Sequence, residues 1–267
     1  MKTKPFQLGV YPGFKGWTWM FFIYLYAPIV VLVVYSFNAS QSAQSWGGFS
    51  SGWYAKAFDN HEIQSAAINS LIVGVIATVL ATVAATLAAL TMARGRRFRG
   101  YAVADAILML PLVVPEIATA VATLGFFATV GISLGLTTVI IAHTVFCIPF
   151  AFLPIKARLS GMDNTLEQAA QDLYANDWQT FRYVTLPLLT PGIVAGAMLS
   201  FIISIDDFII TLMVAGAGAT TLPLYIYSMI RRGITPEVNA ISTVMLVISV
   251  LLVTAYWFVS RGKVVSH

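Results

Sequence analysis

The sequence predicts an all-α polytopic membrane protein with six transmembrane helices. Of its 267 residues, 58% are hydrophobic and only 10% are charged, whereas soluble domains carry about 25% charged residues. Several runs without any charge exceed the roughly 20 residues that a membrane-spanning helix needs. This composition largely excludes soluble enzymes and nucleic-acid-binding proteins. The uncharged runs lie between Lys15 and Lys56, Glu62 and Arg94, Glu116 and Lys156, and Arg182 and Asp206.

Apolar runs separated by turn residues and charges define the candidate spans. The first run is too long for a cleavable signal peptide and lacks a clear small-residue cleavage site, so we expect it to be a retained span. A glycine-rich turn at 131–135 separates the third span from the fourth. We expect a single transmembrane domain over residues 1–267, with spans at about 17–37, 67–92, 102–130, 136–155, 190–214 and 240–260 and a long cytoplasmic loop at 156–189.

The distribution of positive charge predicts the orientation. An even number of spans places both termini on the same side of the membrane. All but three of the 15 Lys and Arg residues then fall on the side of the termini, and the exceptions are Lys56, Arg231 and Arg232. Because cytoplasmic loops carry an excess of Lys and Arg, both termini are predicted to be cytoplasmic.

The cytoplasmic loop contains two short helical stretches. Asp163 is a suitable N-cap for the first, and Glu167 lies near the positive end of that helix. A second stretch runs through Arg182 and is expected to stop at Leu186-Pro187. This helix–turn–helix would suit docking into a groove of another protein, and a solvated connector is the alternative.

The spacing of residues in this loop resembles the EAA loop of ABC-importer permeases. That pattern is E-A-A-x-x-x-G, nine further residues, then I-x-L-P. Here Gln168-Ala169-Ala170 and Tyr174 match the first part, and Leu186-Pro187 end the second without a gap. Gln168 stands where the family prefers Glu, and Tyr174 replaces the glycine, so a positive φ is either not needed there or adopted with strain. The resemblance assigns ATPase coupling to Glu167, Gln168, Ala169, Ala170, Tyr174, Ala175, Leu186 and Pro187.

Other stretches narrow the resemblance to the spermidine/putrescine-type permeases. It implies a type I ABC-importer permease (MetI-like) architecture in the bacterial inner membrane, in an ATP-driven, binding-protein-dependent importer for polyamines or a similar small organic cation. The implied partners are a homologous second permease subunit, two ATP-binding subunits and a periplasmic substrate-binding protein. Small residues in the second span would permit close helix packing in that assembly. The stretches are Leu25-Tyr26-Ala27-Pro28 with Tyr35-Ser36-Phe37-Asn38, Arg96-Arg97-Phe98-Arg99-Gly100, Pro111 to Glu116, Ser204 to Phe208, and Thr221-Leu222-Pro223 through Pro236 to Ala240.

The motifs that are missing fit a non-catalytic subunit. No G-x-x-x-x-G-K-[ST] phosphate loop occurs, so we expect no cofactor in this chain and ATP with Mg²⁺ in the partner ATPase subunits. A lone cysteine, Cys147, excludes a disulfide framework and a thiolate metal cluster. With only three histidines, including His143 in the fourth span, a metal or catalytic site is not expected. His143 could line a pathway or be a hydrogen-bonded structural residue.

Three acidic residues fall inside predicted spans, where ionisable groups are costly and suggest a substrate or ion pathway. Glu116 lies in the third span, beside a kink expected from Pro111 and Pro115, and Asp206 and Asp207 lie in the fifth. At about 1.5 Å per residue, all three share one level in the outer half of the bilayer. On a continuous helix, Asp207 joins Ser200, Ser204 and Thr211 in a polar stripe and Asp206 points away. Asp207 is therefore predicted as the stronger cation contact and Asp206 as mainly structural, although Asp207 could instead only tie helices together.

An alternative function uses the same acidic residues. The chain could be a self-contained secondary transporter or channel driven by an ion gradient, with Glu116, Asp206 and Asp207 as proton or sodium sites. That hypothesis gives no reason for the spacing in the cytoplasmic loop, which therefore discriminates between the two.

Overall fold

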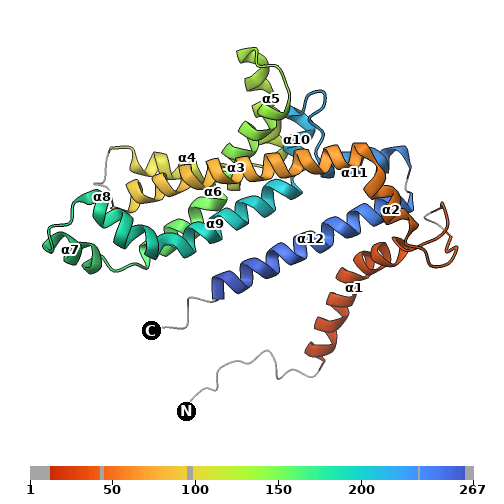
Figure 1. Ribbon diagram of the computed structural model, residues 1–267, viewed down its shortest axis with the longest axis horizontal. Coiled ribbons are helices and arrows are strands. Elements are labelled where there is room, and N and C mark those ends of the chain that lie inside the picture. The colour runs from red at the N-terminus through yellow and green to blue at the C-terminus, as the bar shows by residue number, and fades with distance from the viewer. Residues whose placement is uncertain (1–12, 43–44, 95–98, 234, 262–267) are drawn as a thin grey trace. The chain divides into compact units, whose positions relative to one another are not determined.

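The structure, a computed structural model, describes residues 13–42, 45–94, 99–233 and 235–261, with side chains up to Phe258. All regular structure in these ranges is helical (Figure 1). Five helices are long and apolar enough to cross a membrane, and the bent pair α4 and α5 makes a sixth candidate span. The predicted all-α polytopic fold is confirmed. The cytoplasmic placement of both termini stays a prediction, and five of the cations counted for it lie outside the described residues: Lys2, Lys4, Arg96, Arg97 and Lys263.

The chain forms two compact units. The first comprises Met1–Asn60 and Met229–Leu246, and the second comprises His61–Ser228 and Val247–His267. The first unit contains α1 (Phe14–Tyr35) and α2 (Gly52–Asp59). The second is built around α3 (His61–Arg94), α6 (Leu136–Ser160) and α9 (Leu186–Asp206), and α11 (Leu222–Arg232) and α12 (Pro236–Arg261) contribute residues to both units.

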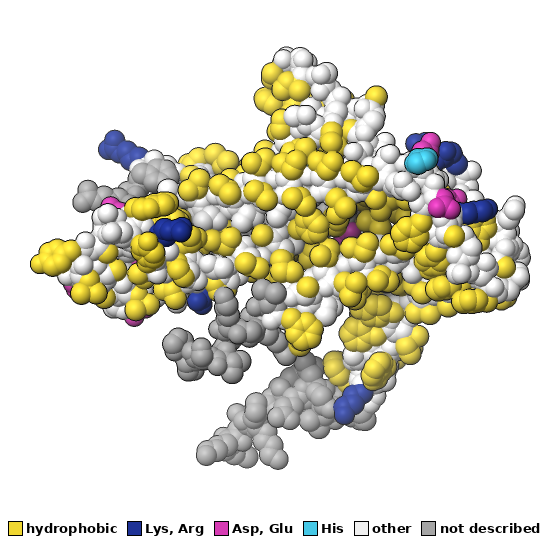
Figure 2. Space-filling view, in the orientation of Figure 1, with side chains coloured by type: hydrophobic (Ala, Val, Ile, Leu, Met, Phe, Trp, Pro, Cys, Tyr) yellow, Lys and Arg dark blue, Asp and Glu magenta, His cyan; other side chains and the backbone are white. Residues whose placement is uncertain are grey.

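Helix α3 sorts its residues by size rather than by polarity. Large side chains at positions 71, 75, 79, 83 and 87 are 51–60% exposed, and Figure 2 shows hydrophobic side chains along this helix. Alanines at 77, 81, 85 and 89 are fully buried and let α3 pack closely against α6 and α9. The small residues of the second span therefore permit close helix packing as expected, and they pack against α6 and α9 of the same chain.

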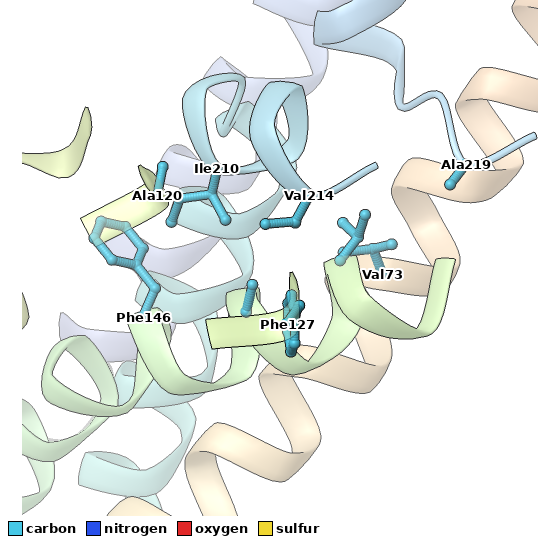
Figure 3. Packing of buried hydrophobic residues seen from close by; sticks show 9 residues of the cluster. Val73, Ala120, Phe127, Phe146, Ile210, Val214 and Ala219 are labelled. Atoms are coloured by element: carbon cyan, nitrogen blue, oxygen red, sulfur yellow. The ribbon is translucent and has the colours of Figure 1, made fainter. Parts of the chain in front are cut away.

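The contact between α6 and α9 depends on close backbone approach. A Cβ atom at Gly196 would lie 2.6 Å from the carbonyl oxygen of Ala151, so only glycine fits there without a shift. A second buried cluster lies next to the helix breaks described below and is shown in Figure 3. It joins α3, α5, α6 and α10 through Val73, Ala120, Phe127, Val139, Ala142, Phe146, Ile210, Val214 and Ala219.

The third predicted span is two helices rather than one. Helix α4 (Tyr101–Val113) and helix α5 (Glu116–Val130) meet at an angle of 111°. Val114 between them is extended, with ψ 134°, because the residue before a proline is driven out of the helical region. Pro115 also lacks the N–H that would continue the helix. The kink expected from the prolines is therefore a complete break.

The fifth predicted span is also interrupted, which corrects the assumption of a continuous helix over 190–214. Helix α9 ends at Asp206, Asp207 is extended with ψ 133°, and the short α10 (Ile209–Val214) follows. No proline lies at this break. The Asp207 side chain instead accepts hydrogen bonds from the backbone N–H groups of Ile210 at 3.4 Å and Thr211 at 3.1 Å. It thereby caps the new helix in the manner of an N-cap aspartate.

The loop that the sequence places in the cytoplasm contains α7 (Thr165–Asp172), α8 (Asp177–Thr180) and a π-helix (Phe181–Thr185) that leads directly into α9. Leu186-Pro187 therefore does not stop the second short helix as expected. Pro187 lies in the first turn of α9. The wider hydrogen-bonding pattern of the π-helix before it accommodates the missing N–H, so the helical path continues from Asp177 to Asp206.

Candidate functional site

The two helix breaks meet at a pair of carboxyl groups. Glu116 is the first residue of α5 and Asp207 lies between α9 and α10. Their side chains lie close enough to interact directly. Helices α5 and α10 pack against each other behind this contact. The two residues that the sequence placed at one membrane level therefore lie together.

Asp207 is buried among hydrogen-bond donors. Only 2% of its side chain is exposed, and its Oδ2 lies 3.0 Å from Nε2 of His143. The same oxygen accepts a hydrogen bond from the Thr211 hydroxyl at 3.2 Å in addition to the backbone N–H groups of α10. Such donors stabilise a buried carboxylate. Asp207 thus holds α6, α10 and Glu116 together.

His143 occupies the centre of this network with a side chain that is 1% exposed. Its Nδ1 lies 2.8 Å from the Ser204 hydroxyl, and its Nε2 lies 3.0 Å from that of Thr211. The Thr211 hydroxyl donates its hydrogen to Asp207, so the network assigns a hydrogen to Nε2 of His143. The sequence left two possibilities for His143, and the structure makes it a fully hydrogen-bonded residue.

The polar stripe predicted on the fifth span faces α6. Ser200, Ser204, Asp207 and Thr211 are all buried. The Ser200 hydroxyl donates to the carbonyl oxygen of Cys147 at 3.3 Å, and Ser204 and Thr211 contact His143. Polar groups in a membrane-spanning region must find partners within the protein, and α6 supplies them here.

Asp206 has the opposite environment. Its side chain is exposed and accepts a hydrogen bond from the Ser249 hydroxyl of α12 at 3.3 Å, while Glu116 is half-buried. The accessible carboxyl groups are therefore Asp206 and Glu116, and Asp207 is enclosed. The polar stripe expected on a continuous helix did not reveal this difference, because α9 ends at Asp206. Among the described residues, no group of three His, Cys, Asp or Glu side chains could hold a metal ion.

The second predicted site is the turn between α7 and α8. Tyr174 has φ +62°, so the residue that replaces the motif glycine adopts the left-handed conformation with strain. The N–H of Ala175 donates to the carbonyl oxygen of Ala170 at 3.0 Å, which is the bond that closes a Schellman motif. Leu173, Tyr174 and Trp178 are 82%, 97% and 67% exposed. The turn therefore presents three large hydrophobic side chains on its surface.

The other residues of the predicted coupling loop differ in exposure. Gln168, Ala169 and Pro187 are exposed. The remaining residues with an intermediate exposure are half-buried: Glu167, Ala170, Ala175 and Leu186.

Local capping shapes the ends of the two short helices. The N-cap of α7 is Asn164 rather than the predicted Asp163. Oδ1 of Asp163, one residue earlier, accepts a hydrogen bond from the N–H of Thr165 at 2.9 Å, which lowers the pKa of Asp163 below its usual value. Asn176 and Gln179 exchange hydrogen bonds of 2.8 and 2.9 Å in a capping box at the start of α8. Each of these contacts joins two residues that are at most three positions apart in the sequence.

Comparison with known proteins identifies the family. Residues 81–261 match the family described as binding-protein-dependent transport system inner membrane component. The spermidine/putrescine transport system permease protein PotC of Haemophilus influenzae is 40% identical over 240 residues, which cover 90% of this chain and 93% of that protein. The putrescine transport system permease protein PotI of Escherichia coli is 34% identical over 249 residues, which cover 91% and 89%.

The fold has a counterpart among solved structures. A chain in the crystal structure of a bacterial ABC transporter involved in the import of the acidic polysaccharide alginate superposes with a TM-score of 0.73 at 16% identity, covering 92% of this chain and 93% of that one. The predicted MetI-like permease architecture is confirmed, and the relatives are transport permeases rather than enzymes. The chain is a multi-pass membrane protein and belongs to the family of binding-protein-dependent transport system inner membrane components, the permease subunits of ABC importers.

Proposed function

We propose that this permease subunit carries polyamines such as spermidine and putrescine, or a similar small organic cation, across the bacterial inner membrane. The observation that carries the proposal is the acidic group at the two helix breaks, formed by Glu116, Asp206 and Asp207. The substrates in the names of the relatives support a polyamine. Membership of a binding-protein-dependent family favours ATP-driven import over the alternative of an ion-coupled transporter.

The three acidic residues have different tasks in this proposal. Asp206 and Glu116 are accessible and attract the ammonium groups of the substrate, because Coulomb attraction strengthens as the local dielectric constant falls. Asp207 is already paired with His143 and contributes by holding Glu116 beside the pathway. This assignment exchanges the tasks that the helical-wheel argument gave to Asp206 and Asp207.

The proposal includes the partners that the sequence implied. A homologous second permease subunit completes the pathway, two ATP-binding subunits hold ATP and Mg²⁺, and a periplasmic substrate-binding protein delivers the cation. The family description supports the binding protein directly. This chain then contributes no catalytic residue, no cofactor and no metal of its own, and both of its termini lie in the cytoplasm.

The turn between α7 and α8 is the proposed contact with an ATP-binding subunit. Leu173, Tyr174 and Trp178 form an exposed apolar group there, and exposed hydrophobic groups of this kind mark protein interaction sites. Gln168 and Ala169 lie on the exposed surface of α7, and Ala170 and Ala175 fix the shape of the turn. Leu186 and Pro187 begin α9, so they carry a displacement of the loop into the membrane helices.

Uptake by the assembled transporter tests the proposal. The complex with its permease, ATPase and binding-protein partners is reconstituted into vesicles, and uptake of labelled spermidine and putrescine is measured with and without ATP. We expect ATP-dependent uptake, and a rise in KM of about tenfold for Asp206→Asn, which is the effect of losing about 1.4 kcal/mol of attraction. Asp59→Asn is the matched control, because Asp59 is exposed in α2 outside the candidate spans.

Two results would contradict the proposal. Uptake that persists without ATP would favour the ion-coupled transporter. An unchanged KM in Asp206→Asn, equal to that of Asp59→Asn, would show that the substrate does not use this charge.

A further inference from the structure

A second polar cluster joins the coupling loop to the membrane helices. Arg94 is the last residue of α3, and its Nε lies 3.3 Å from Oε2 of Glu167 in α7. Its Nη1 donates a hydrogen bond to Oδ1 of Asn164 at the start of the same helix. The other carboxylate oxygen of Glu167 accepts a hydrogen bond from the hydroxyl of Thr185 at 2.9 Å. One carboxylate therefore connects α3, α7 and the π-helix that leads into α9.

These polar contacts hold one end of α7. The helix has no buried residue, so apolar burial does little to fix its position. The side chains of Arg94 and Glu167 are only 23% and 19% exposed. Both contacts that Arg94 makes with α7, to Asn164 and to Glu167, lie at the first turn of that helix. The opposite end leads to Leu173 and Tyr174, which are almost fully exposed. Helix α7 is thus anchored at its beginning and free to meet a partner at its end.

The anchor lies on rigid structure. Two residues before Arg94, Met92 is buried in a cluster that also contains Phe152 of α6 and Leu189 of α9. The end of α3 and the start of α9 are therefore parts of one packed body. A displacement of α7 that pulls on Glu167 would reach this body at two points, through Arg94 and through Thr185.

We propose that Arg94 is a positioning residue for energy coupling: through its ion pair with Glu167, it makes α7 move as one body with the ends of α3 and α9. This inference rests on the proposed function, in which α7 receives the motion of an ATP-binding subunit. The two neighbouring residues Glu167 and Gln168 then have different roles. Gln168, at the position where the family prefers Glu, is exposed toward a partner, whereas Glu167 is used within the chain.

Charge exchange across the pair tests this inference in the assembled transporter. The variants are Arg94→Gln, Glu167→Gln and the double variant Arg94→Glu with Glu167→Arg. Glu167→Gln keeps the volume and an oxygen that accepts from Thr185, and Asn164 can donate to a carboxylate as readily as it accepts from a guanidinium. Arg99→Gln is the matched control, because Arg99 is an exposed arginine in the turn before α4.

The readouts are the amount of assembled complex, the substrate imported per ATP hydrolysed, and the stimulation of hydrolysis by the loaded binding protein. Each single variant is expected to assemble normally and to lower the coupling ratio at least about fivefold, the lower end of typical coupling energies. The double variant is expected to recover part of the loss, as interacting charges do in double-mutant cycles, and not all of it, because it removes the acceptor of the Thr185 hydroxyl. A merely stabilising role would change the amount of complex and leave the ratio intact.

Several outcomes would overturn the inference. They are an unchanged coupling ratio in both single variants, a double variant no better than either single one, or an equal loss in Arg99→Gln. If the single variants fail to assemble, the double variant still decides, since recovery of assembly without recovery of the ratio refutes the proposal. Stimulation by the binding protein does not depend on which substrate is carried, so a wrong substrate class shows in the unmodified complex and is distinguishable from a wrong role for Arg94.

Discussion

Two regions of the molecule place their functional side chains under opposite conditions. At the helix breaks, His143 and Asp207 are almost completely enclosed and bond to each other. In the coupling loop, Leu173 and Tyr174 are almost completely exposed. Buried polar groups in a membrane protein depend on one another because no water replaces a lost partner, whereas the loop can exchange a contact for water. Changes in the first region should therefore cost stability, and changes in the second should cost function alone.

The largest effect on stability is expected from His143→Ala. This variant leaves the Asp207 carboxylate buried without its hydrogen-bond partner on α6, and a buried charged group that loses a partner costs about 3 kcal/mol or more. The thermal midpoint of the purified complex, followed in detergent, measures the loss. His143→Gln retains an N–H donor and should lose less.

Thr144→Val is the control for this experiment. The hydroxyl of Thr144 donates to the carbonyl oxygen of Ile140 in its own helix at 2.7 Å, so its removal should cost less than about 1 kcal/mol. Equal midpoints for His143→Ala and Thr144→Val would mean that the enclosed network does not stabilise the fold.

In the predicted coupling loop, Ala170→Arg should reduce transport without reducing stability. Ala170 is half-buried and its carbonyl oxygen closes the turn at Tyr174, so a bulky charged side chain changes the shape presented to the ATP-binding subunit. We expect uptake to fall at least about tenfold while ATP hydrolysis no longer responds to the binding protein. The thermal midpoint should stay within the range of surface substitutions, about ±0.5 kcal/mol.

Normal stimulated hydrolysis and uptake in Ala170→Arg would remove the loop from the coupling mechanism. A lowered midpoint would place it instead among the parts of the chain that stabilise the fold.

Asp206 and Asp207 allow the same comparison, of stability against function, between two adjacent residues. Asp207→Asn keeps the shape of the cap but replaces an acceptor with a donor among donors, which should destabilise the fold by about 1–3 kcal/mol. Asp206→Asn changes an exposed group and should stay within about 0.5 kcal/mol, with its effect seen in KM. The thermal midpoint and the KM of uptake, measured for both variants, distinguish the effect on stability from the effect on substrate binding. A raised KM with an unchanged midpoint in Asp207→Asn would restore Asp207 as the direct cation contact.

The sequence predicted what depends on composition and on neighbouring residues. Hydrophobic runs gave the helical membrane fold, and motif spacing gave the family and the two-helix loop. The break at Pro115 followed from local backbone sterics. The break at Asp207 did not, because it depends on a side chain that caps α10 while paired with His143 from another helix.

Tertiary contacts also explain why Asp207 is enclosed and Asp206 is exposed. A helical wheel describes the faces of one helix and says nothing of where that helix ends. A signal was available in the sequence: an Asp-Asp pair in an apolar run favours a local cap over a continuous helix. The partner of Arg94, in contrast, could not be found from the sequence, since Glu167 lies in a different helix.

A smaller effect is expected at Tyr174, where two variants distinguish the backbone strain from the contact made by the exposed ring. A non-glycine residue in the left-handed region costs about 1–2 kcal/mol, so Tyr174→Gly should stabilise the turn locally and slow hydrogen exchange at the end of α7. Tyr174→Ala keeps the strain and removes the ring. If the ring contacts the ATP-binding subunit, both variants weaken coupling, and only Tyr174→Gly slows exchange. Slower exchange in both variants would contradict the assignment of strain.

The smallest effect concerns the cap of α7 and its dependence on pH. The hydrogen bond from the N–H of Thr165 lowers the pKa of Asp163 below its usual 3.8. A group with a lowered pKa in the folded state stabilises that state above its unfolded pKa, and this contribution disappears as the pH falls through the folded value. Hydrogen-exchange protection in α7 should therefore decline below about pH 4. It should decline less in Asp163→Asn, which keeps an oxygen acceptor that does not titrate, although the Glu167 carboxylate still contacts the same turn. Asp172→Asn, at the other end of the same helix, should decline as the unmodified chain does. A decline of the same size in Asp163→Asn would show that another group titrates, and the cap would then contribute nothing to the acid sensitivity of the loop.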